Sequence, residues 1–477
     1  MTSLSSQRKT KIVCTIGPAT AEPETIGRLI LAGMDVARLN FSHGDHASHR
    51  ALVDSLRRQA AANGREVGIL QDLAGPKIRL GRLAREIRLA AGDEVRLISG
   101  DENSANPEWL PVGYPHLYDD VELGDRILLA DGLVELHVSA KEHPQVICQV
   151  VVGGLLSSHK GVNLPTSHLR VSSFTAKDQD DLRLGLEVGV DFVALSFVRH
   201  EHDLTPVRHI LNQQDHPPLL IAKIEKPEAV ERFSEILEQV DGIMVARGDL
   251  GVEMPLEEVP VIQKRLISEA RQAGKLVITA TQMLRSMMES PRPTRAEATD
   301  VANAILDGTD AVMLSDETAV GRYPLEAVAV LDRIALATEP TLDGRAFLRE
   351  PLSGLLPATE AAISRAACYL AQDIDPAAIV ASTTSGGTAR LIARYRPAAP
   401  LLGLTPIPAT CRQLNLSWGV IPALIPAFDD AEQMFDLARA WIADHGLATP
   451  GERVILTAGV PLGQPGTTNL LKVMTLA

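Results

Sequence analysis

The hydrophobic positions of this 477-residue chain fall into short runs that alternate with amphipathic stretches. Eight near-continuous apolar runs read KIVCTIGP, MDVARLNFS, EVGILQDL, DFVALSFV, LLIAKIEK, DGIMVARGD, KLVITATQ and DAVMLSDE. Strands that are buried on both faces have this pattern when they form a parallel sheet covered by helices. Eight strand-helix units therefore predict an α/β fold built on a closed (β/α)8 barrel, the TIM barrel.

Two further segments depart from the barrel pattern. Between the third and fourth runs stand shorter alternating segments, GDEVRLI, GDRILLADGLVELHV and PQVICQVVVGG, which predict an inserted small β-barrel lid domain. After the barrel, AAIVAST, PLLGLTP, RVILTAG and LLKVMTL predict the strands of an open α/β domain. The predicted limits are 1–75 and 170–340 for the barrel, 76–169 for the lid and 341–477 for a C-terminal regulatory domain.

Composition narrows the class of protein. The net charge of -14 argues against a non-specific nucleic-acid binder, which needs a basic surface. The four cysteines are scattered without a CxxC pair, so the sequence indicates neither a zinc knuckle nor a disulfide framework. No apolar run has the length of a signal peptide or of a membrane span. We expect a cytoplasmic protein with no nucleic-acid and no membrane partner.

Polar side chains stand at the ends of the predicted strands, where a barrel builds its active site. Taken alone, each could be a solvated loop residue or half of a structural ion pair. As a set they indicate a binding site, because charges beside buried strands are costly unless they are paired, hydrated or bound to a ligand. The set, in strand order, is Arg38, Asn40, Ser42, Asp72, Lys223, Glu225, Arg247, Asp249, Thr281 and Gln282.

The charges of this set indicate phosphoryl transfer. Glu225 and Asp249 offer the hard oxygen ligands that suit Mg²⁺. Arg38, Arg79 and Lys223 can neutralise phosphoryl oxygens in a loose transition state. The predicted turn VARGDLG could aim backbone N–H groups at a carboxylate or a phosphate. No Walker loop, GxGxxG or HExxH motif points to another chemistry.

Several sequence blocks spread along nearly the whole chain carry a family resemblance. They read CTIGPAT, ARLNFSHG, GPKIRLG, SHKGVNLP, AKIEKPEAV, VARGDLGVE and ATQMLRSMMESPRPTRAEATDVANAILDGTDAVMLSDETA. These blocks resemble the pyruvate kinase family. The resemblance implies transfer of the phosphoryl group of phosphoenolpyruvate to ADP, giving ATP and pyruvate, the last step of glycolysis. It also implies Mg²⁺, with Mn²⁺ as a substitute, and a homotetramer.

The resemblance also implies catalytic roles for the matching residues. Glu225 and Asp249 would be the metal ligands. Lys223 and Arg38 would face the transferring phosphoryl group, and Lys223 would also stabilise the enolate that is left behind. Thr281 would lie near the enolate carbon and assist its protonation through a water molecule.

Substrate and nucleotide contacts follow from the same resemblance. The amides of Gly248 and Asp249, next to Arg247, would hold the substrate carboxylate, so that Lys223 and Thr281 complete the substrate site. The implied nucleotide contacts are Pro18, His43, Arg79, Lys160 and, in the lid, Asp131.

One segment departs from the common form of the family. Potassium-dependent members generally read Thr-Lys-Gly-Pro-Glu after the strand-ending acid and bind K⁺ with the Thr and the counterparts of Asn40, Ser42 and Asp72. This chain reads Leu73-Ala74-Gly75-Pro76-Lys77, which resembles the potassium-independent branch. We interpret Lys77 as a substitute for K⁺, since an ammonium supplies the same charge. The alternative is a surface lysine in the hinge to the lid.

A Ser/Thr/Gly loop in the third domain is a candidate effector site. The family uses the corresponding loop for phosphorylated activators, whereas the local alternative is an ordinary N-capped helix start. The last loop, AGVPLGQPGTTN, lacks the Trp and Arg of relatives that respond to fructose 1,6-bisphosphate, so AMP or a sugar monophosphate is the alternative activator. The candidate residues are Ser382, Thr383, Thr384, Ser385, Gly386, Gly387 and Thr388.

Alternative interpretations stay open at this point. His43, His46 and His49 resemble a metal cluster, but we expect one nucleotide contact and two surface histidines. The chain could be another Mg²⁺-dependent barrel enzyme of phosphoenolpyruvate or pyruvate, such as a lyase. It could also be a catalytically silent metabolite sensor, although Lys223, Glu225, Asp249 and Thr281 argue against that.

Overall fold

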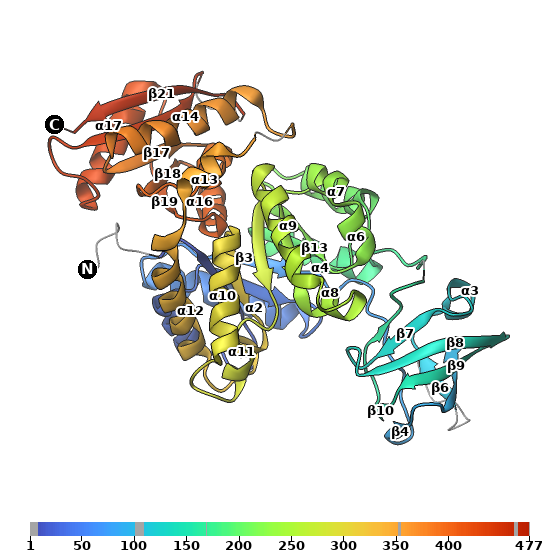
Figure 1. Ribbon diagram of the computed structural model, residues 1–477. Coiled ribbons are helices and arrows are strands. Elements are labelled where there is room, and N and C mark those ends of the chain that lie inside the picture. The colour runs from blue at the N-terminus through green and yellow to red at the C-terminus, as the bar shows by residue number, and fades with distance from the viewer. Residues whose placement is uncertain (1–7, 101–108, 168, 352–353, 462–465, 477) are drawn as a thin grey trace.

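The computed structural model describes residues 8–100, 109–167, 169–351, 354–461 and 466–476. A central barrel carries an inserted sheet domain on one side and a C-terminal α/β domain on the other (Figure 1). The predicted combination of a TIM barrel, an inserted β domain and a C-terminal α/β domain is confirmed. The inserted domain forms two separate sheets, not the closed small β-barrel that was predicted. The limits proposed for the domains stay predictions.

The barrel is a closed ring of eight parallel strands, and neighbours in the chain are neighbours in the ring. Each strand coincides with one of the eight apolar runs, because a strand covered on both faces needs an apolar side chain at nearly every position. The strands are β1 (Lys11–Thr15), β2 (Val36–Asn40), β3 (Gly68–Asp72), β12 (Phe192–Leu195), β13 (Leu219–Ile224), β14 (Gly242–Ala246), β15 (Leu276–Ala280) and β16 (Ala311–Leu314).

Helices cover the outside of the barrel. Several begin at a capping box in which the N-cap side chain and the third helical residue satisfy each other's backbone N–H groups, as at Asp45, Thr175 and Thr294. The helices are α1 (Pro23–Ala32), α2 (His46–Ala62), α4 (Ala176–Val188), α5 (Thr205–Leu211), α6 (Pro227–Glu231), α7 (Phe233–Gln239), α8 (Arg247–Glu253), α9 (Val259–Gln272), α10 (Arg295–Asp307), α11 (Asp316–Ala319) and α12 (Pro324–Thr338), with 3₁₀ turns η2 (Glu201–Leu204), η3 (Arg285–Met288) and η4 (Glu339–Thr341).

Four aspartates organise the face of the barrel where the strands begin. Each stands directly before its strand and accepts the backbone N–H of the second residue of a neighbouring strand at 2.8 to 2.9 Å; they are Asp35, Asp191, Asp241 and Asp310. The C-terminal domain docks on this face, where Arg412 lies 2.8 Å from Asp191 and Arg396 lies 2.9 Å from Asp310. Leu416 of the same domain packs into the apolar core inside the barrel. The opposite face, where the strands end, stays available for a site.

The inserted domain lies between β3 and β12 and has its own apolar core. It consists of a six-stranded sheet, in the order β11-β7-β8-β9-β5-β6, and a two-stranded sheet of β10 and β4. The quoted segments predicted β5, β7, β8 and β9 but missed the short strands β4, β6, β10 and β11. The elements are β4 (Ile87–Leu89), β5 (Glu94–Ser99), β6 (Trp109–Val112), α3 (Leu117–Asp120), β7 (Arg126–Leu129), β8 (Val134–Glu142), β9 (Gln145–Val152), β10 (Gly154–Leu156) and β11 (Val162–Asn163).

The C-terminal domain is an open five-stranded sheet in the order β19-β18-β17-β20-β21. Four strands were predicted, and the missed strand β19 contains Pro422, which is tolerated because β19 is an edge strand. The elements are α13 (Gly344–Arg349), α14 (Ala358–Ile374), β17 (Ala378–Ser382), α15 (Gly387–Ala393), β18 (Leu401–Thr405), α16 (Pro408–Gln413), η5 (Leu414–Leu416), β19 (Val420–Leu424), α17 (Ala431–Asp444), β20 (Arg453–Gly459) and β21 (Thr468–Thr475).

Among the described residues, no helix combines the length and the apolar character needed to span a bilayer.

Part of the last loop considered in the sequence, residues 462–465, lies outside the described residues.

Candidate active site at the carboxyl ends of the barrel strands

Lys223 is the centre of a buried polar cluster where three neighbouring strands end. Its Nζ lies 2.8 Å from Oε1 of Glu225 and 3.4 Å from Oδ1 of Asp72. It also donates a hydrogen bond of 2.8 Å to Oγ of Ser196. Lys223 belongs to β13, Asp72 ends β3 and Ser196 follows β12, so the closed ring brings together residues that are far apart in the sequence.

The charges in this cluster hold one another ionised. Burial alone would lower the pKa of the Lys223 ammonium, but the carboxylates of Asp72 and Glu225 outweigh that effect and raise its pKa above the ordinary value. Burial alone would raise the pKa of Asp72, but Lys223 and Arg38 hold it below its usual range. Arg38 Nε lies 2.6 Å from Asp72 Oδ2, and the same guanidinium donates to Thr15 Oγ1 at 2.9 Å.

Glu225 and Asp249 form a pair of carboxylates that fits a divalent cation. Glu225 is fully buried, and its Oε2 accepts the backbone N–H of Phe197 at 2.8 Å. Its Oε1, apart from the ion pair with Lys223, receives no hydrogen bond from any described residue. Burial raises the pKa of Glu225, and the nearby charge of Asp249 acts in the same direction. A divalent cation would relieve both effects, since it supplies further positive charge to the two carboxylates.

Among the described residues, no larger metal cluster competes with this pair. Across the described ranges of the chain, no group of three or more His, Cys, Asp or Glu side chains could hold a metal ion. A site with few protein ligands suits Mg²⁺, which keeps several coordination positions for substrate and water.

Residues 247–253 form the short helix α8, where the sequence predicted a turn. The guanidinium of Arg247 donates to the carbonyls of Ala280 and Thr281 at 3.2 and 2.9 Å and lies 2.6 Å from Asp300 Oδ1. These contacts support a role for Arg247 in holding the segment after β15. Thr281 itself has a φ of 75°, which is unusual for a β-branched residue.

Gly248 lies against Thr281 so closely that a side chain does not fit. A Cβ at Gly248 would lie 2.5 Å from Cγ2 of Thr281. Given the role that the resemblance implies for Thr281, we predict that Gly248→Ala lowers kcat/KM for the implied substrate, phosphoenolpyruvate, about 100-fold, because a displacement near 1 Å at a reacting centre has an effect of that order. Steady-state kinetics measures the change.

Gly251 in the same helix provides the matched control. A Cβ at Gly251 meets its nearest neighbour, Leu256 Cδ1, at 3.4 Å, an ordinary contact. Gly251→Ala is expected to change kcat/KM by less than about twofold, like most substitutions without a steric conflict. Equal kinetics in the two variants would contradict the close approach at Gly248.

A cavity of about 360 Å³ separates the inserted domain from the barrel and contains several predicted nucleotide contacts. Its lining includes Arg79, Asp131 and Lys160 together with Lys77 and Asp249. Nη1 of Arg79 also donates a hydrogen bond of 3.1 Å to the carbonyl of His159. The cationic side chains of Arg79 and Lys160 therefore line the same cavity as Asp249, one of the two carboxylates of the proposed metal pair. Pro18 and His43 are exposed, follow β1 and β2, and are not among the residues that line this cavity.

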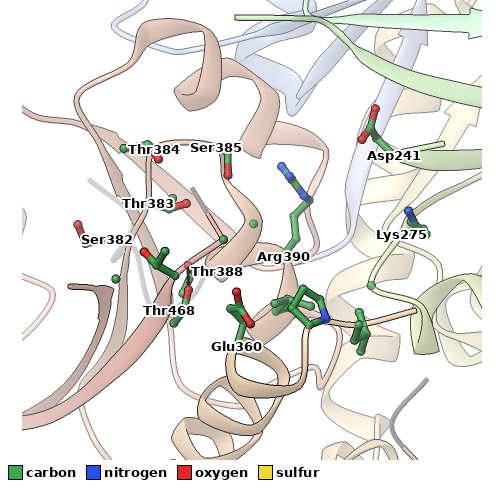
Figure 2. A pocket seen from close by; sticks show the side chains of 18 of the residues that line it. Asp241, Lys275, Glu360, Ser382, Thr383, Thr384, Ser385, Thr388, Arg390 and Thr468 are labelled. Atoms are coloured by element: carbon green, nitrogen blue, oxygen red, sulfur yellow. Dashed lines mark hydrogen bonds between the residues drawn. The ribbon is translucent and has the colours of Figure 1, made fainter. Parts of the chain in front are cut away.

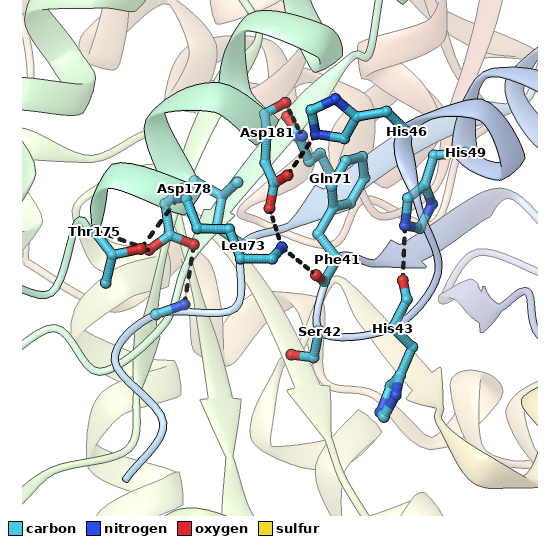
Figure 3. A network of polar contacts seen from close by, with 12 residues as sticks. Phe41, Ser42, His43, His46, His49, Gln71, Leu73, Thr175, Asp178 and Asp181 are labelled. Atoms are coloured by element: carbon cyan, nitrogen blue, oxygen red, sulfur yellow. Dashed lines mark hydrogen bonds and ion pairs between the residues drawn. The ribbon is translucent and has the colours of Figure 1, made fainter. Parts of the chain in front are cut away.

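The three neighbouring histidines do not share a ligand site. His46 Nε2 lies 2.8 Å from Asp181 Oδ1, and His49 Nε2 lies 2.8 Å from the carbonyl of His43 (Figure 3). His49 is buried and stacks on Phe41 with ring centroids 3.9 Å apart. Burial lowers the pKa of His49. The expectation that His49 is a surface residue was wrong, because its ring is buried and stacks on Phe41.

The residues predicted for the monovalent-cation region have different surroundings. Asn40 Oδ1 accepts the backbone N–H of Ser42 at 3.1 Å, and Leu73 is fully buried. Lys77 is exposed but lines the cavity. Desolvation and the charge of Lys223 lower the pKa of Lys77, while Asp249, Asp72 and Glu225 act to raise it.

The sequence analysis missed several polar residues of the site. Ser196 accepts from Lys223 and donates to the carbonyl of Leu73 at 2.7 Å. Thr15 accepts from Arg38. Thr15 ends β1 and Ser196 directly follows β12. The position of a polar side chain at a strand end, which identified the other candidates, could therefore have identified these two. Lys226 and Glu253 were also missed, and no local pattern identifies them.

Fold and site together define a phosphotransferase built on a TIM barrel. The family model "Pyruvate kinase, barrel domain" matches residues 7–328, and "Pyruvate kinase, alpha/beta domain" matches residues 361–474. The chain therefore belongs to the pyruvate kinase family.

Individual relatives agree with this assignment. The chain is 47% identical over 475 residues to the pyruvate kinase of Geobacillus stearothermophilus, covering 99% of this chain and 81% of the relative. It is 47% identical to the pyruvate kinase of Sporosarcina psychrophila, covering 98% and 80%. The crystal structure of a pyruvate kinase from Cryptosporidium parvum is similar with a TM-score of 0.92 and 37% identity, covering 99% of this chain and 97% of that one.

Proposed function

We propose that this chain transfers the phosphoryl group of phosphoenolpyruvate to ADP and releases pyruvate and ATP. The observation that carries the proposal is the cluster around Lys223, in which a buried ammonium and the carboxylates of Glu225 and Asp72 meet at the barrel mouth. Beside it, Asp249 lines a cavity rich in cationic side chains. Anionic substrates need such a positive region, because the chain as a whole is acidic.

Lys223 acts as a fixed cation in this proposal. Its raised pKa keeps the ammonium protonated at neutral pH and makes it a weak proton donor, so the proposal gives Lys223 an electrostatic role. It stabilises negative charge on the transferring phosphoryl group and on the enolate oxygen. Arg38, held by Asp72 and Thr15, supplies a second fixed charge. Thr281 would orient the water that delivers the proton to the enolate carbon.

Glu225 and Asp249 would hold Mg²⁺, or Mn²⁺ in its place. The bound cation would neutralise charge on phosphoryl oxygens. The amides of Gly248 and Asp249 would orient the substrate carboxylate. Glu225 is itself kept in position by the backbone N–H of Phe197.

ADP would occupy the cavity between the inserted domain and the barrel. Arg79 and Lys160 would contact its phosphates from the lid side, and Asp131 lies on the same wall. Pro18 and His43 would contact the nucleotide from the ends of β1 and β2. Lys77, which lines the cavity near three carboxylates, would supply the charge that K⁺ supplies in other family members.

The test is an assay with phosphoenolpyruvate, ADP and Mg²⁺ that follows pyruvate and ATP together. The first buffer contains tetramethylammonium as the only added monovalent cation, and the second contains K⁺. Stoichiometric products in both buffers support the reaction and the role of Lys77. Activity only with K⁺ refutes the role of Lys77 alone. Pyruvate without ATP favours a lyase, and no product favours a metabolite sensor.

A cavity of about 270 Å³ in the C-terminal domain supports a regulatory site (Figure 2). Its lining includes Arg390, whose Nη1 atom is buried and has no hydrogen-bond partner within the described part of the chain. Burial lowers the pKa of Arg390, so an anionic ligand would relieve an unfavourable environment. Of the candidate loop residues, those that line the cavity are Ser382, Thr383, Thr384, Ser385, Gly387 and Thr388.

The same cavity is lined by residues of the barrel. Asp241 and Lys275 stand directly before β14 and β15, the strands that end at the helix of Asp249 and at Thr281. A ligand in the cavity would therefore contact the starts of two strands whose ends carry the site. This arrangement supports regulation by a phosphorylated metabolite.

We predict that AMP or a sugar monophosphate shifts the saturation curve of phosphoenolpyruvate about five- to tenfold, which is the lower part of the usual range for allosteric coupling. Initial rates at fixed ADP and Mg²⁺ measure the shift. Fructose 1,6-bisphosphate is expected to have no effect. An unchanged curve with all monophosphates tested would remove the regulatory proposal and leave the catalytic one intact.

Assembly into a homotetramer is proposed from the family alone. Sedimentation velocity of the purified chain tests it, and a monomer would overturn it.

A further inference from the structure

Glu253 connects the inserted domain to the two segments that carry the proposed metal ligands. Its Oε1 accepts a hydrogen bond of 2.7 Å from Nδ2 of Asn163 and lies 2.6 Å from Nζ of Lys226. Asn163 ends β11 of the inserted domain, and Lys226 directly follows Glu225. Glu253 ends α8, the same short helix that contains Asp249. One carboxylate oxygen therefore joins three separate parts of the molecule.

A second segment of the inserted domain lies near the same end of α8. A Cβ built on Gly132, in the connection between β7 and β8, would have Val252 Cγ1 as its nearest neighbour at 3.6 Å. This connection also contains Asp131, which lines the cavity between the domains. The segments of Asn163 and Gly132 thus both lie beside the end of α8, at residues 252 and 253.

The burial of Glu253 makes this junction resistant to displacement. Glu253 and Lys226 are only 5% and 7% exposed, and Glu253 Oε2 has no hydrogen-bond partner in the described ranges. A buried carboxylate depends on each of its donors, because a lost partner cannot be replaced freely by water. A shift of the inserted domain that moves Asn163 away would leave Oε1 with Lys226 alone. The cost of losing this hydrogen bond to a buried carboxylate therefore opposes such a shift.

We propose that Glu253 is a positioning residue that sets the inserted domain, and with it the lid side of the nucleotide cavity, relative to Glu225 and Asp249. It acts through Asn163, Lys226 and α8 and does not touch the reacting atoms. The inference rests on the proposed location of ADP in that cavity. The expected consequence is selective. Loss of the hydrogen bond between Asn163 and Glu253 lowers kcat/KM for ADP and leaves the residues that bind phosphoenolpyruvate in place.

The test compares Asn163→Ala, Glu253→Gln and the double variant with the unchanged enzyme. Asn163→Ala removes a hydrogen bond to a charged acceptor and is expected to lower kcat/KM for ADP about tenfold. KM for phosphoenolpyruvate at saturating ADP should stay within about twofold. The double variant should be no worse than Glu253→Gln by more than about twofold, because both changes remove one shared tie.

Gln145→Ala is the matched control. It also removes an amide from the inserted domain, but its partner Arg96 belongs to the same domain. Its ADP kinetics are expected to match those of the unchanged enzyme. If Glu253→Gln fails to fold because Lys226 loses its counter-charge, Asn163→Ala still decides the question.

Three results would overturn the inference. They are ADP kinetics of Asn163→Ala equal to those of Gln145→Ala, a parallel loss for both substrates, and multiplicative effects in the double variant. Each of these leaves the proposed reaction standing. The reaction itself fails only if the unchanged enzyme forms no ATP.

Discussion

Lys223→Met is expected to lower kcat for ATP formation by about 10³- to 10⁵-fold, the range seen when a cation that stabilises a transferring phosphoryl group is removed. The ammonium is the only side chain that contacts Asp72, Glu225 and Ser196 together among the described residues. Methionine preserves the length of the apolar stem but removes the charge. The measurement is the rate of coupled ATP and pyruvate formation at saturating substrates.

The fold should survive this substitution. Arg38 still pairs with Asp72, and Glu225, whose pKa is already raised by burial, can take up a proton or a divalent cation. Lys264→Met provides the matched control, since it removes an exposed ammonium paired with Asp307 on the outside of the barrel. Near-normal turnover of Lys223→Met, with the circular dichroism of the unchanged enzyme, would refute the role assigned to Lys223.

Lys77→Glu is expected to lower activity without K⁺ by about 100-fold, comparable to the loss of one preorganised electrostatic contact. The substitution removes a cation and places a carboxylate near Asp72, Glu225 and Asp249, the groups that act on the pKa of Lys77. Adding K⁺ should restore part of the activity, because a monovalent cation could then occupy the region. The measurement is the ratio of kcat/KM values in K⁺ and in tetramethylammonium.

Arg85→Glu makes the same change of charge at an exposed position of the inserted domain and should not create a response to K⁺. The unchanged enzyme is expected to be equally active in both cations. If Lys77→Glu retains full activity in tetramethylammonium, Lys77 is a surface lysine of the hinge. If it loses activity but ignores K⁺, the ammonium is needed for another reason.

Much of the fold could be predicted because its signals are local. A strand buried on both faces needs a continuous apolar run, and all eight runs became strands of one closed ring. Strands that depend on their neighbours were missed. β11 is two residues long, and β19 contains Pro422, so neither has a pattern that indicates a strand without its partner in the sheet.

Local pattern and family resemblance together identified most candidate residues, whose roles stay predictions. Arg38, Asp72, Lys223, Glu225, Asp249 and Thr281 all stand where a barrel places its active site. Their pairing was not visible in the sequence. The contact of Lys223 with Ser196 spans 27 residues, and that of Arg38 with Asp72 spans 34. His49 illustrates the same limit, since its burial depends on stacking against Phe41.

The amino-acid sequence by itself determined the class of fold, the order of the elements and the chemical types of side chain at the strand ends. Periodicity and turn residues act within a few positions along the chain, which is why they can be read without a structure. Only the tertiary structure decided that Asn163, Lys226 and Glu253 meet, and that Asp241, Lys275 and Arg390 line one cavity. Such contacts depend on the closure of the barrel and the docking of whole domains, and these determine which distant residues share a low-dielectric environment.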